Sequence, residues 1–245
     1  KDIKINIYDN AVIQDSLRII KGDTIFVNYL DSIIKDIKIR KNAEVLNYRY
    51  AKVDSNSNKQ IFEDYLSSKK MNLNFIDGEI YSLDLNGMAI TKFNVVKDTL
   101  LKGLNNVLGD SIYISMQNQV IEKMYVEGNA TGEFTPEKNN SSVESKIEYS
   151  ADIIDYLVKA EKTFLIDNAF VDYDNTILNA GEIYVDWEQN FLEAKIKDGI
   201  YPSVNGLGES PTYGELLTYD FTTKRGKMIK GRTNYGQANN QMYYK

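Results

Sequence analysis

Carboxylates are the most abundant side chains here that could act as a general acid or base, with 35 Asp and Glu among 245 residues. Two of them would suffice for glycoside hydrolysis, but no particular pair stands out by its position. Histidine and cysteine are both absent. The sequence therefore has no Ser-His-Asp triad, no thiol nucleophile, no disulfide and no metal site built from imidazole or thiolate. Most hydrolase and metalloenzyme classes are excluded, and neither a cofactor nor a metal is expected.

Basic residues gather near the C-terminus in Lys224-Arg225-Gly226-Lys227, followed by Lys230 and Arg232. Cations at Lys224, Arg225 and Lys227 could pair with phosphate groups of a ligand, because charge-assisted hydrogen bonds to phosphate are strong. A solvated hairpin turn is the alternative, and the sequence favours it.

Net charge and hydropathy limit the partners further. The formal net charge of −6 argues against a broad phosphate-binding surface, so nucleic acid is excluded as a partner. Hydrophobic residues make up 42% of the chain, yet no apolar run approaches the roughly 18 to 20 residues of a membrane-spanning helix. Residues 1–7 alternate polar and apolar side chains and therefore predict a strand, not a signal peptide.

Strand-forming residues dominate the sequence. Tyr occurs 18 times and Pro only three times, and helical spacing of apolar residues is rare. One segment, 60–70, does fit a helix, because Ile61, Tyr65 and Leu66 would share one face. We expect an all-β chain with this single helix candidate.

A strand–turn–strand unit recurs about six times, and self-similarity of this kind indicates a repeat architecture. The copies lie at 22–43, 71–89, 109–130, 151–172, 180–196 and 214–235. Turns are expected at Asp31-Ser32, Asp77-Gly78, 117–119 and Gln189-Asn190, because such residues tolerate the positive φ of tight hairpins. Units that bury one face must stack on their neighbours, so the sequence predicts a β-sandwich or jellyroll.

Strand alternation assigns the two faces of each unit. The inward set is Ile25, Val27, Leu73, Phe75, Ile112, Ile114, Met116, Ile183, Val185 and Trp187. The outward set is Thr24, Asn72, Ser111, Ser115, Glu182 and Asp186. Bulges or close strand contacts are expected at four small clusters, Asn42-Ala43, Gly87-Met88-Ala89, Asn129-Ala130 and Asn168-Ala169.

Two polar stretches, 135–142 and 201–211, predict loops. The first is either a long surface loop or the boundary between two segments. We therefore divide the chain into an N-terminal jellyroll segment at 1–134, a boundary at 135–149 and a C-terminal jellyroll segment at 150–245.

The third unit, with Gly109-Asp110-Ser111-Ile112 and Glu127-Gly128-Asn129-Ala130, resembles the OstA-like repeats of the LptA and LptD families. The stretch 217–226, followed by Gly231-Arg232-Thr233 and Tyr235-Gly236, is similar to the part of LptD that precedes its membrane barrel. Residues 178–187 resemble a family strand motif, although Gly181 stands where Asp is more usual. The matching units cover most of residues 22–236.

This resemblance implies an elongated, twisted β-jellyroll that carries lipopolysaccharide by its lipid A acyl chains, with no catalytic step. It implies a periplasmic location associated with the outer membrane. The implied partners are an LptA-like jellyroll joined strand to strand, and an outer-membrane barrel with its plug lipoprotein. The implied groove lining is Ile25, Val27, Leu73, Phe75, Leu83, Leu85, Ile112, Ile114, Met116, Met124, Val126, Ile183, Val185, Trp187, Leu217, Tyr219 and Phe221. Phosphate contacts would fall to Lys224, Arg225 and Lys227.

Without the resemblance, the same inward stripe is more often an ordinary sandwich core than a ligand groove. Trp187 would then anchor the core, and Met116 and Met124 would fill gaps in it. The main alternative function is a carbohydrate-binding or carbohydrate-active β-sandwich, followed by a structural surface repeat protein. A glycan-binding module would show an exposed aromatic platform, whereas a lipid conduit would show an interior slot lined by apolar side chains.

Overall fold

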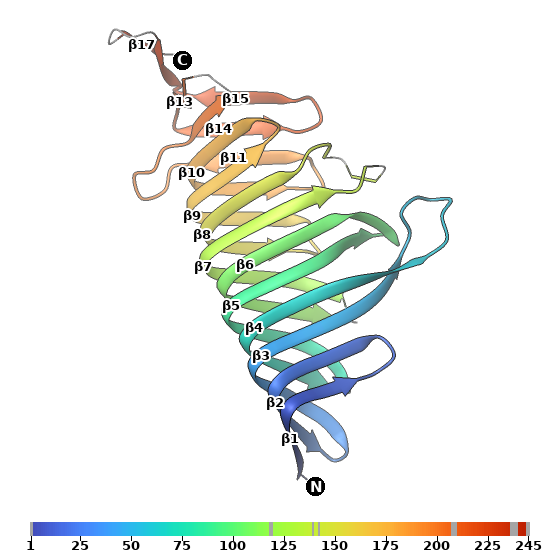
Figure 1. Cartoon of the computed structure of the whole chain (residues 1–245). Coiled ribbons are helices and arrows are strands. Elements are labelled where there is room, and N and C mark those ends of the chain that lie inside the picture. Colours follow the sequence, from blue (N-terminus) through green and yellow to red (C-terminus); the bar gives the residue numbers. More distant parts are fainter. Residues whose placement is uncertain are drawn as a thin grey trace.

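The computed structural model describes residues 2–117, 120–138, 140–141, 143–206, 210–235 and 240–243. These residues contain seventeen strands, all joined in one sheet, and no helix. No helix able to cross a membrane is therefore present in the described part. The strands stack along one long axis, from β1 next to the N-terminus to the short strands next to the C-terminus (Figure 1). The prediction of an elongated, twisted all-β jellyroll is confirmed.

Ten long strands make up most of the sheet, and each pairs antiparallel with the next. They are β1 (Asp2–Gln14), β2 (Arg18–Leu30), β3 (Ile33–Ala51), β4 (Gln60–Ile76), β5 (Glu79–Lys97), β6 (Leu100–Gln117), β7 (Val120–Pro136), β8 (Ile147–Leu157), β9 (Lys162–Tyr173) and β10 (Thr176–Asp186). Seven short strands follow: β11 (Phe191–Lys195), β12 (Ser203–Gly206), β13 (Thr212–Tyr213), β14 (Leu216–Asp220), β15 (Arg225–Ile229), β16 (Arg232–Tyr235) and β17 (Asn240–Tyr243).

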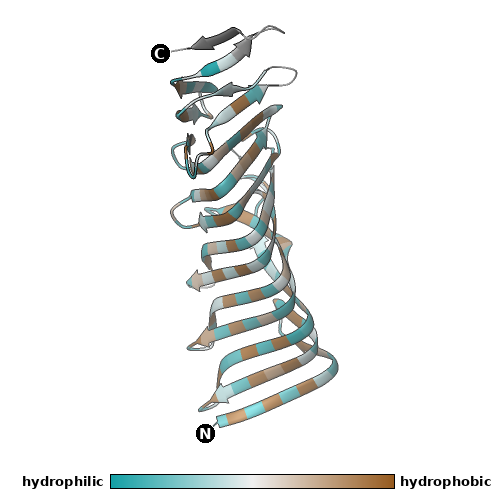
Figure 2. Ribbon diagram, turned by 90° about the vertical axis from the view of Figure 1, so that its left-hand side faces the viewer, coloured by the Kyte–Doolittle hydropathy of each residue, from teal (hydrophilic) through white to brown (hydrophobic). Residues whose placement is uncertain are grey.

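The long strands bend, and the bend folds the sheet into two facing walls (Figure 2). Every pairing from β1–β2 to β9–β10 has a register shift near mid-strand, and these shifts form one line across the sheet. We call wall A the strand parts 2–8, 24–30, 33–40, 70–76, 79–86, 111–117, 120–127, 153–157, 162–166 and 182–186, continued by β11, β14 and β15. Wall B comprises 11–14, 18–22, 43–51, 60–68, 89–97, 100–109, 130–136, 147–151, 169–173 and 176–180, continued by β12, β13, β16 and β17.

Residues in the left-handed region build the corner between the walls. Positive φ angles occur in alternate strands at Asp9-Asn10, Lys41-Asn42, Gly87-Met88, Gly128-Asn129 and Asp167-Asn168. Extra residues of this kind bend a strand while its pairing resumes beyond them. Short polar side chains bridge to the preceding strand: Asn42 Nδ2 donates to Asp23 Oδ1 at 2.9 Å, and Asn168 Nδ2 donates to Asp152 Oδ2 at 2.9 Å. The bulges expected at the four small clusters are confirmed.

The inward faces of the two walls meet in one apolar core. All seventeen side chains assigned to the inward face or groove lining are buried in this core or pack against it. Phe75, Met116, Trp187, Tyr219 and Phe221 are partly buried, and the other twelve are buried. Burial contributes about 1.5 to 3 kcal/mol for each large apolar side chain, so the alternating pattern is the main source of stability.

The helix expected at 60–70 is wrong, because these residues form the first half of β4. Residues 60–68 pair with residues 43–51 of β3, and residues 65–67 also pair with β5. Hydrogen bonding to two neighbouring strands outweighs the helical spacing of three apolar residues. Ile61 consequently faces solvent, while Leu66 packs against the core.

Two smaller predictions also need correction. The stretch 201–211 is not wholly a loop, because β12 lies within it and pairs with residues 176–179 of β10. Asp186 was expected to face solvent but is buried. Its Oδ1 accepts from Gln189 N at 3.0 Å and its Oδ2 accepts from the Tyr184 hydroxyl at 3.0 Å. These donors, the Gln189 amide first, outweigh partial desolvation and hold the pKa of Asp186 below its usual value.

The polar stretch proposed as a boundary begins in the last two residues of β7 and precedes β8. These two strands pair directly, so the sheet continues through this region. Glu137 N donates to Lys102 O at 2.9 Å, which ties the start of the loop to β6. The expected turns at Asp31-Ser32, Asp77-Gly78 and Gln189-Asn190 are present, whereas residues 118–119 of the third turn lie outside the described residues.

Candidate functional site

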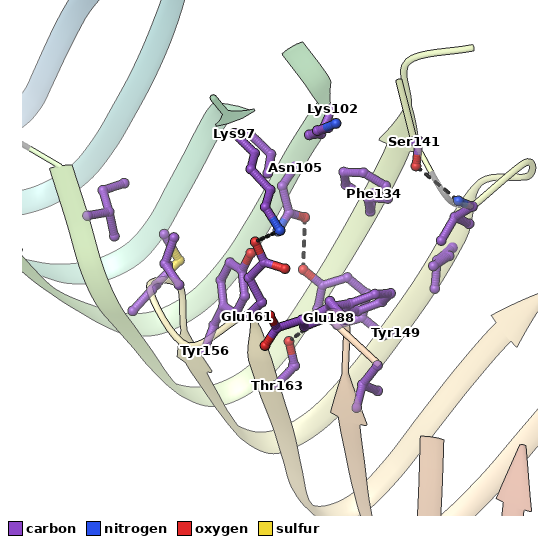
Figure 3. A pocket seen from close by; sticks show the side chains of 18 of the residues that line it. Lys97, Lys102, Asn105, Phe134, Ser141, Tyr149, Tyr156, Glu161, Thr163 and Glu188 are labelled. Carbon is purple, nitrogen blue, oxygen red and sulfur yellow. Dashed lines mark hydrogen bonds and ion pairs between the residues drawn. The ribbon is translucent and has the colours of Figure 1, made fainter. Parts of the chain in front are cut away.

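A cavity of about 800 Å³ lies between the two walls, from β5 to β11. Wall B contributes the end of β5, the start of β6 and parts of β7 to β9. Wall A contributes parts of β6 to β11. Figure 3 shows side chains from both walls pointing into this space. A volume of this size is at the upper end of the roughly 300 to 1,000 Å³ typical of small-molecule sites.

Apolar side chains line the depth of the cavity. Val107 and Val171 come from wall B, and Met124, Ile154 and Val185 come from wall A. All five are buried members of the core cluster. The strand alternation that forms the core therefore also forms the cavity lining, and the site is a local opening of the core.

Charged side chains stand at the mouth. Lys97, at the end of β5 in wall B, reaches across to Glu161 in the β8–β9 turn of wall A, with Lys97 Nζ 2.6 Å from Glu161 Oε1 (Figure 3). Glu161 O accepts from Trp187 N at 2.9 Å, which fixes the turn against β10. The hydrogen bond that Lys97 donates to Glu161 raises the pKa of Lys97, so this lysine stays cationic at neutral pH. We call the Lys97–Glu161 ion pair the mouth clasp.

Tyr149 and Tyr156 place hydroxyl groups inside the cavity, from wall B and wall A respectively. The Tyr149 hydroxyl donates to Asn105 Oδ1 at 2.8 Å. Burial raises the pKa of Tyr149 far above its usual value, and burial followed by the nearby Glu161 raises the pKa of Tyr156 to about 12. Both groups are therefore neutral hydroxyls at physiological pH, able to donate or accept hydrogen bonds.

An aromatic group closes the C-terminal end of the cavity. The rings of Trp187 and Phe221, which directly follow β10 and β14 of wall A, are stacked with centroids 6.0 Å apart, and Phe221 meets Tyr173 of wall B edge to face at 5.9 Å. Trp187 Nε1 donates to Thr163 Oγ1 at 2.8 Å, which fixes the indole orientation. This group joins the two walls where β10 ends and gives the cavity a rigid apolar boundary.

The groove narrows toward the N-terminus. A second cavity of about 50 Å³ adjoins the first, and both are lined by Ile121 and Met124. Its wall B side contains Arg49 and Asp64, with Arg49 Nε 2.6 Å from Asp64 Oδ2. The groove thus has a wide part lined by β5 to β11, and a narrow part lined by β2 to β5 of wall B and by β5 to β7 of wall A.

The predicted lining residues divide between these spaces. Met124, Val185, Trp187 and Phe221 line the large cavity, and Leu83, Ile114 and Met116 join Met124 in the small one. The remaining ten lie in or against the core and line neither cavity: Ile25, Val27, Leu73, Phe75, Leu85, Ile112, Val126, Ile183, Leu217 and Tyr219. Their role as lipid contacts stays a prediction.

The predicted phosphate contacts lie outside the cavity lining. Lys224 ends the β14–β15 turn, and its Nζ lies 3.1 Å from Glu144 Oε2, which comes from the loop after β7. Arg225 and Lys227 are exposed on β15. The hairpin-turn interpretation therefore describes their position, and their pairing with phosphate stays a prediction.

Sequence reasoning missed the polar side chains inside the groove. Asn105 and Tyr149 occupy inward positions of regular alternating strands, so strand periodicity could have found them. Asp64 could not be found this way, because the helical interpretation of 60–70 removed it from the alternation. The mouth clasp joins residues 64 positions apart in sequence, and no local pattern indicates such a pair.

The arrangement suits an amphiphile. An apolar interior, neutral hydroxyls and a charged mouth can hold a molecule with apolar chains and a polar head. Among the described residues, no group of three or more His, Cys, Asp or Glu side chains is placed to hold a metal ion.

No protein-family model matches this sequence, and no curated protein matches it significantly. Among solved structures, the chain is similar to LptH of Pseudomonas aeruginosa, described as the LptA-homologous periplasmic component of the conserved lipopolysaccharide transport device. The two are 15% identical, with a TM-score of 0.42, and the alignment covers 56% of this chain and 84% of LptH. A likeness at this level does not identify a function.

Proposed function

We propose that this protein binds the acyl chains of lipopolysaccharide in the cavity between walls A and B and passes the lipid along the groove. The observation that carries the proposal is the cavity of about 800 Å³, which opens inside a continuous apolar core and has a polar mouth. The sequence resemblance to the LptA and LptD families supports the choice of lipid. No covalent step or cofactor takes part in this function.

Burial of acyl chains supplies the affinity. Each CH₂ group removed from water contributes roughly 0.8 kcal/mol, and neighbouring positions along an apolar lining offer similar burial. A chain can therefore shift along the cavity without losing much free energy. The charged mouth keeps the polar head of the lipid in water, where it needs no desolvation.

Strand β1 supports the proposed docking of a second jellyroll. In the described residues it pairs only with β2, so its other edge leaves backbone N–H and C=O groups unpaired. An unpaired edge can receive a strand of a partner. The periplasmic location, the outer-membrane barrel with its plug lipoprotein and the two-segment division of the chain belong to the same proposal.

Photocrosslinking tests the lipid function. A benzophenone side chain is placed at Ile154 or Val185, which line the cavity, and at their sequence neighbours Ile153 or Tyr184 as outward controls. With purified lipopolysaccharide, we expect adducts at the two lining positions and none at the controls. Folded variants that give no adduct at either lining position would overturn the proposal.

A further inference from the structure

A buried polar network lies at the narrow end of the large cavity. Asp64 in wall B has only 4% of its side chain exposed and binds Arg49 Nε at 2.6 Å. Asp64 Oδ1 also accepts from Asn94 N at 2.8 Å and from Asn94 Nδ2 at 3.0 Å. Asn94 Nδ2 donates in addition to Glu63 O at 2.9 Å. Both Asp64 oxygens are thereby occupied, and the three side chains form one connected unit, the Arg49–Asp64–Asn94 network.

The network lies where the groove narrows. Arg49 and Asp64 line the small cavity, whose wall A side is apolar, with Leu83, Ile114 and Met116. This cavity of about 50 Å³ continues the large one of about 800 Å³ past their shared residues Ile121 and Met124. An acyl chain that extends from the large cavity toward the N-terminus passes Thr91 and Phe93 of β5 and then meets Asp64 of β4 and Arg49 of β3.

Desolvation would stop the chain at this point. The Arg49 side chain is still 28% exposed, so part of it contacts water, although its Nε is buried against Asp64. A CH₂ group pressed against it would remove this water and offer no hydrogen bond in return, which is unfavourable for a charged group. The gain from burying each further CH₂ is then offset by the loss of hydration.

We propose that the Arg49–Asp64–Asn94 network is the end stop of the groove and sets the longest acyl chain that the large cavity accommodates. The inference rests on the proposed lipid function and adds a limit on chain length for the lipid at rest in the large cavity, while movement along the groove past the network carries the desolvation cost described above. The ligand class is an amphiphile whose acyl chains, when bound in the large cavity, end between β5 and β11.

A neutral, nearly isosteric variant tests the end stop. Arg49→Met removes the guanidinium, and Asp64→Asn removes the charge but keeps an oxygen that can accept from Asn94 N and Nδ2. Replacing both members of a buried ion pair avoids leaving one charge unpaired. The matched control is Lys123→Met with Asp155→Asn, which removes an ion pair of 2.9 Å on the outer face of wall A.

Binding is measured with saturated fatty acids of increasing chain length, by displacement of a fluorescent fatty acid. For the unchanged protein and the control variant, we expect affinity to rise about fourfold for each added CH₂ until the cavity is filled, and then to stay constant. In the Arg49→Met/Asp64→Asn variant, the rise should continue over several more carbons. An unchanged limit in that variant would overturn the end stop while leaving lipid binding intact.

A second measurement uses the unchanged protein and needs no variant to fold. A fatty acid with a diazirine at its terminal carbon should label peptides of β5 to β7, which line the junction of the two cavities. Labelling of β2 would show that the chain passes the network and would overturn the end stop. Absence of any fatty-acid binding would overturn the proposed function and the end stop together.

Discussion

The two halves of the groove are built from the same repeating strand pair but use their inward positions differently. Over β2 to β4, wall A packs Ile25, Ile39 and Leu73 with no exposed surface, and wall B adds the ion pair between Arg49 and Asp64. Over β6 to β9, the inward positions of wall B include Val107 and Val171, and a cavity of about 800 Å³ stays open. We call these the narrow half and the wide half.

Side-chain size on wall B accounts for part of this difference. In the wide half, Gly132 leaves room for the Tyr149 ring, since a Cβ atom at Gly132 would lie 2.0 Å from that ring. The ring can then lie against the strand and leave the space in front of it open. One repeat can therefore give a filled core or a binding cavity, depending on a few inward residues of one wall.

Truncation of a buried leucine should show the largest difference in stability between the two halves. Leu73 is fully buried in the narrow half and lines neither cavity, whereas the equally buried Leu165 lines the large one. Leu→Ala substitutions cost about 2 to 5 kcal/mol, with the larger losses where the side chain is packed on all sides. We expect Leu73→Ala near the top of that range and Leu165→Ala near the bottom, measured by urea unfolding. Equal losses would mean that the cavity is filled with protein atoms in solution.

Disruption of the polar network in the narrow half should cause the next largest loss in the free energy of unfolding. Asp64→Ala leaves Arg49 and two Asn94 donors without their acceptor. The loss of a buried partner is costly, but partial hydration of Arg49 reduces it, so we expect about 2 to 3 kcal/mol.

Asp155→Ala is the control for this change, because it removes a partner of Lys123 on the outer face. We expect that substitution to cost less than about 1 kcal/mol in urea unfolding. A loss from Asp64→Ala no greater than that of the control would show that the network is not desolvated.

Asp64 also shows which features could not be predicted from the sequence. The all-β class, the repeat, the corner clusters and the inward set follow from alternation, because each depends on neighbouring residues of one strand. In β4 the inward positions Asp64 and Ser68 are polar, so alternation is lost there and a helical spacing takes its place. A buried charge is recognisable only from its partners, and Arg49 and Asn94 come from two other strands.

The position and size of the cavity could not be predicted from strand alternation, for a related reason. Whether inward side chains fill the space between two walls depends on their combined volumes across strands, and alternation gives only their direction. The same limit applies to Asp186, whose burial depends on Tyr184 and the Gln189 amide.

Alkaline pH should lower the free energy of unfolding through Tyr149 and Tyr156 of the wide half. Their pKa values are raised in the folded state, to about 12 for Tyr156, from the ordinary value of 10.0. The unfolded chain therefore loses these protons first, and stability falls as pH rises above about 10. Tyr149→Phe/Tyr156→Phe should make the free energy of unfolding fall less steeply between about pH 10 and 12. An unchanged slope would show that neither hydroxyl is buried.

Removal of the mouth clasp should have the smallest effect on stability but a clear effect on the rate of ligand release. Lys97 and Glu161 side chains are 49% and 28% exposed, so Glu161→Gln should change the free energy of unfolding by less than about 1 kcal/mol. The clasp joins the two walls across the mouth, so its removal should speed release of a fluorescent fatty acid severalfold in stopped-flow measurements.

Glu193→Gln is the matched control for the clasp. It removes a 2.6 Å ion pair to Lys195 of nearly equal exposure, 54% and 24%, within a single strand of wall A. The control should leave release unchanged, whereas added salt should speed release from the unchanged protein and have less effect on Glu161→Gln, because exposed ion pairs are screened. Equal release rates for the two variants would show that a ligand can leave the wide half while the clasp is formed.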